Sequence, residues 1–145
     1  MYSKGCVHES CFAADVRFTD PAAETRGFLE LAEAFRALKW LHPVQEDFAI
    51  VQEADAAETD AVDSGRVCID LWQRYTLPFK QPPLRLYSRV VARYDASSGR
   101  ITSVEECWRG VPLLSFAPCA IARRLNGIVS FYVTRGLLPD ADESE

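Results

Sequence analysis

The feature that most limits the fold is a long alternation of apolar and polar residues between positions 44 and 108. Such a period of two is typical of strands that bury one face of a sheet. Turn-forming residues interrupt the alternation, notably the adjacent prolines Pro82 and Pro83 and the segment Asp95–Gly99. The pattern predicts four strands, at Val44–Glu53, Arg66–Leu77, Leu84–Tyr94 and Arg100–Trp108.

Helical patterns flank these strands. Apolar residues recur at helical spacing from Gly27 to Trp40, and Pro43 ends that segment. The pattern predicts three further elements: the end of a short helix at residues 8–14, a brief strand at Val16–Phe18 and a last helix at Cys119–Leu138. This order indicates an α+β fold in which a curved antiparallel sheet carries helices on one face.

Length and composition are those of one domain. The 145 residues are 48% hydrophobic, enough to bury a core without a disulfide or a metal. We expect a single domain over residues 1–139 and an acidic disordered tail at 140–145. Five cysteines without a Cys-x-x-Cys pair predict reduced thiols, and we expect no metal site and no cofactor. The absence of a secretory signal and of a membrane-spanning apolar run predicts a cytoplasmic protein.

The net charge of −5 is distributed unevenly. The first 65 residues carry −8, the next 70 carry +7 and the last ten carry −4. Three arginines share one predicted strand face with an aromatic residue, as in surfaces that bind nucleic acid: Arg85, Arg89, Arg93 and Tyr87. Asp70 and Glu105 fall on the outward faces of neighbouring strands, so cross-strand ion pairs are the simpler interpretation. We therefore expect no nucleic-acid partner.

Several segments resemble a known superfamily. The stretch Cys11-Phe-Ala-Ala-Asp-Val-Arg-Phe-Thr-Asp-Pro21, with Arg26-Gly27 opening a helix, resembles nuclear-transport-factor-2-like (SnoaL-like) proteins. The hairpin at Tyr94–Ile101 is also similar to theirs, and Glu105–Leu114 and Arg123–Gly127 look like uncharacterised, mainly fungal, members. The resemblance covers about residues 8–110. It implies a cone-shaped α+β barrel with an apolar pocket, and a homodimer formed through the outer sheet face.

The inward strand and helix faces predict the lining of that pocket. We expect it to bind a small apolar ligand through Phe18, Phe35, Leu71, Tyr75, Leu86, Val90 and Trp108. Two other functions remain open. One is a small lyase or isomerase, and the other is a dimeric interaction module without catalysis.

Asp20 and Glu106 are the candidate catalytic residues. Asp20 falls where related ketosteroid isomerases hold their base, and a desolvated carboxylate there can transfer a proton. Its simpler role is to cap the turn before Pro21. Glu106 shares a strand face with Trp108, and an inward glutamate must be protonated, paired or hydrated. The tyrosine and the neutral acid that complete the steroid isomerase site have no counterpart, so that reaction is not expected.

The segment Val111–Ile121, followed by Arg123 and Arg124, has two interpretations. It can rest on a membrane surface with its arginines at the headgroups, or it can cover the open end of the cone.

Overall fold

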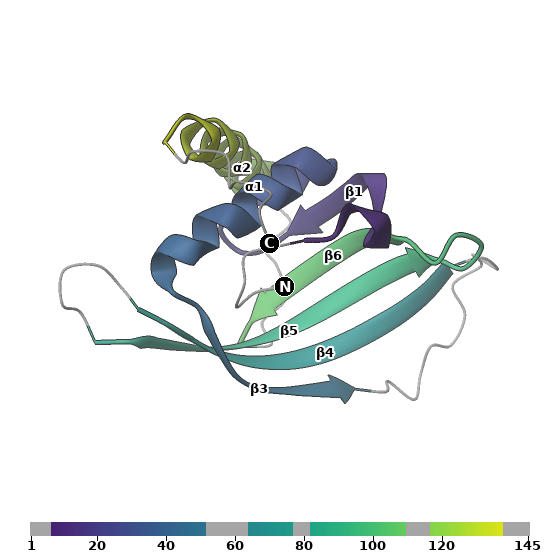
Figure 1. The fold of residues 1–145 in the computed structure, drawn as a ribbon, viewed down its shortest axis with the longest axis horizontal. Helices are drawn as coiled ribbons and strands as arrows, with labels where there is room; N and C mark the ends of the chain where they lie inside the picture. The colour runs from purple at the N-terminus through teal and green to yellow at the C-terminus, as the bar shows by residue number, and fades with distance from the viewer. Residues whose placement is uncertain (1–6, 52–63, 77–81, 110–116, 138–145) are drawn as a thin grey trace, which may run out of the picture.

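Two helices and six strands make up the fold in the computed structural model, which describes residues 7–51, 64–76, 82–109 and 117–137 (Figure 1). The elements follow the chain as η1 (Glu9–Cys11), β1 (Phe12–Thr19), β2 (Glu24–Arg26), α1 (Phe28–Leu38), η2 (Lys39–Leu41), β3 (Val44–Val51), β4 (Ser64–Tyr75), β5 (Leu84–Asp95), β6 (Ile101–Trp108) and α2 (Ala117–Leu137). The expected acidic tail at 140–145 and most of the segment 111–121 lie outside the described residues.

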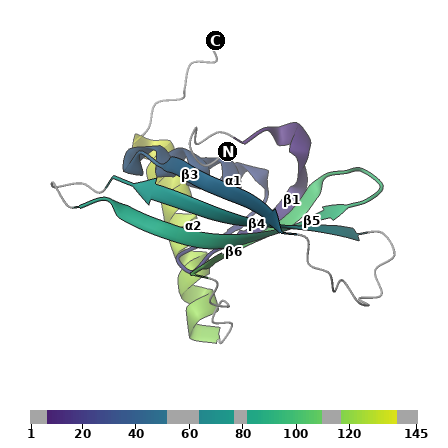
Figure 2. The ribbon, with the colours of Figure 1, turned by 90° about the horizontal axis from the view of Figure 1, so that it is seen from below.

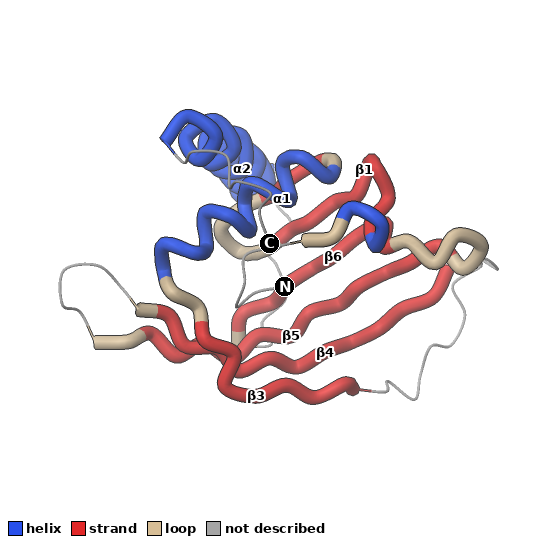
Figure 3. The backbone as a smooth tube through the Cα atoms, viewed as in Figure 1, coloured by secondary structure: helices blue, strands red, loops and turns tan. Residues whose placement is uncertain are grey.

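The strands form one mixed sheet in the order β2-β1-β6-β5-β4-β3 (Figure 3). β3 to β6 are an antiparallel meander, and β2 pairs antiparallel with β1. The sheet differs from the expected antiparallel arrangement at one pair, because β1 runs parallel to β6. β2 and β3 are its edges, so the described strands form an open sheet.

Both helices lie on the same face of this sheet, which confirms the α+β class (Figures 1 and 2). The core lies between α1 and the inner sheet face, and it includes Phe18 of β1, Phe35 of α1 and Val104 of β6. Phe18 and Phe35 meet edge to face, with ring centroids 5.5 Å apart. The helix predicted from Gly27 to Trp40 therefore buries its apolar stripe as its spacing indicates.

The N-terminal segment differs from the prediction. A helix at residues 8–14 is wrong, because only Glu9–Cys11 form a single 3₁₀ turn and β1 begins at Phe12. Phe12, Val16 and Phe18 are buried at even spacing, as a strand requires. Two alanines, which have little preference for strands, hide this alternation in the sequence.

Glycine is required where β2 passes into α1. Gly27 has φ +82°, a backbone conformation that side chains with a Cβ rarely adopt, and its N–H donates to the Val16 carbonyl at 2.8 Å. This bond ties the start of α1 to β1.

The edge strand β3 contains a bulge. Its register with β4 shifts between Gln45 and Asp47, so that Val44 lies opposite Arg74 while Phe48 lies opposite Leu71. The sequence predicts Val44 and Phe48 on one face, whereas the bulge puts them on opposite faces.

Helix α2 packs closely on β2 and α1. An ideal Cβ at Gly127 would lie 2.9 Å from the Glu24 carbonyl carbon and still closer to its oxygen. The two terminal nitrogens of the Arg124 guanidinium, Nη1 and Nη2, donate to the Glu30 carboxylate of α1, and the bond from Nη2 is 2.9 Å long. The Asn126 amide donates to the Ala22 carbonyl at 2.9 Å. Polar side chains thus fix the position of α2.

Candidate functional site

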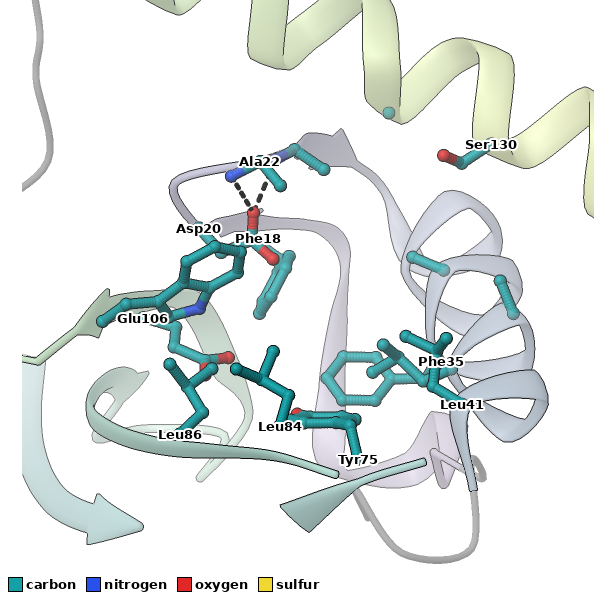
Figure 4. A pocket seen from close by; sticks show the side chains of 16 residues that line it. Phe18, Asp20, Ala22, Phe35, Leu41, Tyr75, Leu84, Leu86, Glu106 and Ser130 are labelled. Carbon is teal, nitrogen blue, oxygen red and sulfur yellow. Dashed lines mark hydrogen bonds between the residues drawn. The ribbon is translucent and has the colours of Figure 1, made fainter. Parts of the chain in front are cut away.

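A cavity of about 350 Å³ lies between the helices and the inner face of the sheet (Figure 4). The lining comes from every layer of the fold. It comprises Phe18, Asp20, Ala22, Ala23, Ala34, Phe35, Ala37, Leu38, Leu41, Tyr75, Leu84, Leu86, Glu106, Trp108, Gly127 and Ser130. Cavities of this size are at the small end of those that hold organic ligands.

Small residues on the helical side leave this space open. Ala34 and Ala37 of α1 face it, and Gly127 allows α2 to approach without a side chain in between. Larger side chains at the two alanine positions would fill the volume. The opposite side is aromatic and aliphatic, with Tyr75 and Leu86 on neighbouring strands.

The structure brings together most of the residues that the sequence assigns to the pocket. Phe18, Phe35, Tyr75, Leu86 and Trp108 line the cavity, together with both candidate acids. Leu71 and Val90 do not line it. They lie deeper in the hydrophobic core, where each is about 95% buried. Strand alternation puts them on the correct face, but it does not show how far along the strand the core ends and the cavity begins.

Asp20 caps a turn and also lines the cavity. Its Oδ1 accepts the backbone N–H groups of Ala22 at 2.7 Å and Ala23 at 2.5 Å, so the carboxylate caps the turn between β1 and β2. The same side chain lines the cavity (Figure 4). Burial raises the pKa of Asp20 above its ordinary value, although these two N–H groups and the charge of Arg123 offset part of the rise. A carboxyl group held in one orientation, with a raised pKa, can exchange a proton with a ligand.

Glu106 is buried on β6, with 3% of its surface exposed. It lies opposite Val90 in the register of β5 and β6, and its carboxyl group is directed into the cavity (Figure 4). Two acids therefore reach one mainly apolar space. No lysine, arginine or histidine belongs to the described lining.

The charges of both acids act on Tyr75. Its hydroxyl donates to Oε1 of Gln73 at 2.9 Å. Burial raises the pKa of Tyr75 above its ordinary value, and the negative charges of Glu106 and Asp20 raise it further. The hydroxyl therefore stays protonated at neutral pH.

Two buried polar residues beside the cavity were missed by sequence reasoning. Gln73 and Ser88 are 1% and 0% exposed on the inner faces of β4 and β5. Gln73 Nε2 and Ser88 Oγ have no hydrogen-bond partner within the part of the chain that the structure describes. The alternation of the strand does indicate that Gln73 points inward, because Gln73 occupies the same strand face as Leu71 and Tyr75.

Several solved structures are similar to this chain over most of its length. A hypothetical protein from Catenulispora acidiphila with a ketosteroid isomerase-like fold, in complex with trimethylamine, is 17% identical. The match covers 79% of this chain and 76% of that one, with a TM-score of 0.49. A nuclear-transport-factor-2-like protein with a cystatin-like fold from Novosphingobium aromaticivorans is 11% identical over 78% of this chain and 71% of that one, with a TM-score of 0.47. PrhC from Penicillium brasilianum is 13% identical over 93% of this chain and 85% of that one, with a TM-score of 0.46.

The chain is similar in fold to nuclear-transport-factor-2-like proteins. At these identities the likeness concerns the fold alone. No protein-family model and no curated protein sequence matches the chain.

The outer sheet face holds the arginines that the sequence places on one strand face, including Arg85 and Arg89. Arg89 binds Asp70 through two hydrogen bonds of 2.8 and 3.1 Å. Arg74 and Arg85 both approach the Glu46 carboxylate, at 3.2 and 3.5 Å. These are the cross-strand ion pairs that the sequence suggests, and they neutralise part of the positive charge.

The described residues contain no group of three side chains that could ligate a metal ion. None of the described helices is long and apolar enough to cross a membrane.

Proposed function

We propose that the protein binds a small, mainly apolar ligand in the cavity, and that this ligand carries a hydrogen-bond-donating group. The observation behind this proposal is the lining, in which two acids, one tyrosine and one serine interrupt a mainly apolar wall. An apolar body gains from leaving water, by about 25 cal/mol per Å² buried. A donor group reaching Asp20 or Glu106 orients the ligand. An anionic ligand would meet two acids without a compensating base.

A matched series of naphthalene compounds tests this proposal. We expect 2-naphthylmethanol and 2-naphthylmethylammonium to bind at least about tenfold more tightly than 2-naphthoate, a difference of about 1.4 kcal/mol, as measured by calorimetry. Glu106→Gln should reduce this preference. Glu105→Gln is the control, because Glu105 is exposed on the same strand and does not line the cavity.

A second pair of variants tests whether the ligand binds in the cavity. Ala34→Phe should fill the cavity and abolish binding, whereas Leu29→Phe, on the exposed side of the same helix, should leave binding intact. Unchanged binding in Ala34→Phe, or tightest binding of 2-naphthoate, would contradict the proposal.

Acid–base catalysis is the second candidate, and the raised pKa of Asp20 beside the buried Glu106 favours it. In this reaction one carboxylate removes a proton from the carbon next to a ligand carbonyl, and the electron pair forms an enolate. Protonation at the same or another carbon then returns the proton and restores the carboxylate.

The bicyclic ketone 2-tetralone tests this reaction in D₂O. We expect the wild-type protein to accelerate deuterium incorporation at C1, measured by NMR, and Asp20→Asn or Glu106→Gln to reduce the rate by about 100-fold or more. Glu105→Gln should not change it. Equal rates with and without protein would exclude this activity for 2-tetralone and leave ligand binding as the function.

A further inference from the structure

Helix α2 presents its apolar side to solvent. Five apolar side chains on this helix are between 46% and 70% exposed: Ile121, Leu125, Val129, Tyr132 and Val133. Four of them recur every four residues and so form one continuous ridge along the helix. We call these five residues, with Leu29 of α1, the α2 ridge. Leu29 is 66% exposed and lines the same surface groove as Tyr132.

The opposite side of α2 is the one that packs on the body, and the side chains that are fully buried there are polar. Arg123 and Thr134 are buried there, with 8% and 4% of their surfaces exposed. The Arg36 guanidinium donates to the Thr134 carbonyl at 3.4 Å. Gly127 leaves no room for a rotated helix, because any Cβ would collide with the backbone of Glu24. The exposure of the ridge is therefore fixed by specific contacts.

The exposed area is large for a single chain. With the fractions above, the α2 ridge presents on the order of 700 Å² of mainly apolar surface, more than the ~300–600 Å² of the largest patch on a typical monomer. A symmetric pair of ridges would bury on the order of 1,400 Å², within the ~1,200–2,000 Å² of specific interfaces.

The charges near the ridge do not suit a membrane. Interfacial helices place free lysines and arginines beside the apolar face. Here Arg123 is buried and Arg124 is bound to Glu30, so neither can reach a headgroup. Arg135 is exposed but lies over the ring of Phe131, with its guanidinium carbon 5.8 Å from the ring centroid, so the described part of α2 offers a single accessible arginine. The sequence after α2 is acidic, with four carboxylates among the last six residues.

We propose that the α2 ridge is a homodimer interface, in which the ridge of one copy packs against the same ridge of a second copy. A ridge with a four-residue period is self-complementary, because two such ridges interdigitate at a crossing angle of about −50°. Two-fold pairing through identical surfaces is also the commonest mode of self-association. The three basic side chains of α2 do not oppose it. Arg123 and Arg124 face the body of their own copy, and Arg135 is not part of the ridge and contacts the Phe131 ring.

The outer sheet face is the rival interface, and one substitution on each surface separates the two. Trp72 is 39% exposed there and contacts Tyr87, with ring centroids 5.2 Å apart. We expect sedimentation analysis to find a dimer of the wild-type protein at high micromolar concentration. Val129→Glu should weaken dimerisation at least about 100-fold, because it puts two unpaired carboxylates in the interface. Trp72→Glu should leave the dimer intact.

Ile121→Glu is the second ridge variant and should act in the same direction as Val129→Glu. Both positions are more than half exposed, so the monomer should keep its fold, as checked by circular dichroism. A monomeric wild-type protein, or a dimer that Trp72→Glu disrupts and both ridge variants leave intact, would overturn the proposal. Neither result would affect the ligand-binding experiments, since the ridge and the cavity lie on opposite sides of α2.

Discussion

Asp20 caps a turn and also faces the cavity, and these roles respond differently to substitution. Asp20→Ala removes the acceptor for two backbone N–H groups and should lower the free energy of unfolding by about 0.5–2 kcal/mol. Asp20→Asn keeps an acceptor oxygen and removes the buried charge. It should therefore be at least as stable as the wild type at pH 7.

The pH dependence gives the sharper measurement. Because its folded pKa is raised, Asp20 holds its proton more tightly in the folded protein than in the unfolded chain. Its contribution to stability thus falls as the pH rises from its ordinary pKa of 3.8 through the raised value, and stays lower above it. In urea titrations, the free energy of unfolding of Asp20→Asn should increase relative to that of the wild type between about pH 3.5 and pH 7. A difference that does not change with pH would show that the pKa of Asp20 is not raised in the folded protein.

For single residues, the sequence predicts which side chains point inward better than it predicts which of them reach the cavity. Alternation along the strands puts Tyr75, Leu86 and Glu106 on the inward face, and the structure finds all three at the cavity. It does not separate them from Leu71 and Val90, because core and cavity share that face. Which of these residues reach open space depends on small side chains in α1 and α2, far away in the sequence.

The two glycines of α2 provide a matched test of how this helix packs. Gly127→Ala should lower the free energy of unfolding by about 1–3 kcal/mol, because the methyl group collides with the backbone of Glu24. Gly136→Ala adds a methyl group with no atom within 4 Å, so it should raise stability by about 0.5–1 kcal/mol through helix propensity. Thermal and urea unfolding measure both changes. Equal effects would show that α2 does not lie closely against β2.

Elements with a strong period could be predicted, and irregular ones could not. The predicted strand at Leu84–Tyr94 and the observed β5 at Leu84–Asp95 agree to one residue. The three residues of β2 are too few to show a period, and the bulge in β3 depends on its pairing with β4. The spacing of apolar residues also predicts α2 correctly as a helix. It does not show that the apolar side is the exposed one, because that choice is made by Gly127, Arg124 and their contacts.

For the whole molecule, ion pairs join the acidic and the basic parts of the sequence. The net charge of −5 combines an acidic first half with a basic sheet region. On the outer sheet face part of the positive charge is paired locally, as in the contact of Arg89 with Asp70. Between the helices, Arg124 of the basic half binds Glu30 of the acidic half, and this contact lowers the pKa of Glu30. Opposite charges from distant parts of the chain thus help to hold the layers together.

The parallel pairing of β1 with β6 has a consequence for how the chain acquires its structure. Phe18 lies opposite Val104, so β1 pairs with a strand that is synthesised more than eighty residues later. Hairpins of the β3–β6 meander join near neighbours and can form first, whereas contacts between distant segments form slowly. On the ribosome, β1 can pair with β2 early, but its other edge must remain unpaired until β6 has emerged from the exit tunnel. During that interval Phe12, Val16 and Phe18, which are buried in the folded protein, lack their neighbours on β6, and a chaperone that binds short apolar segments would find its target there.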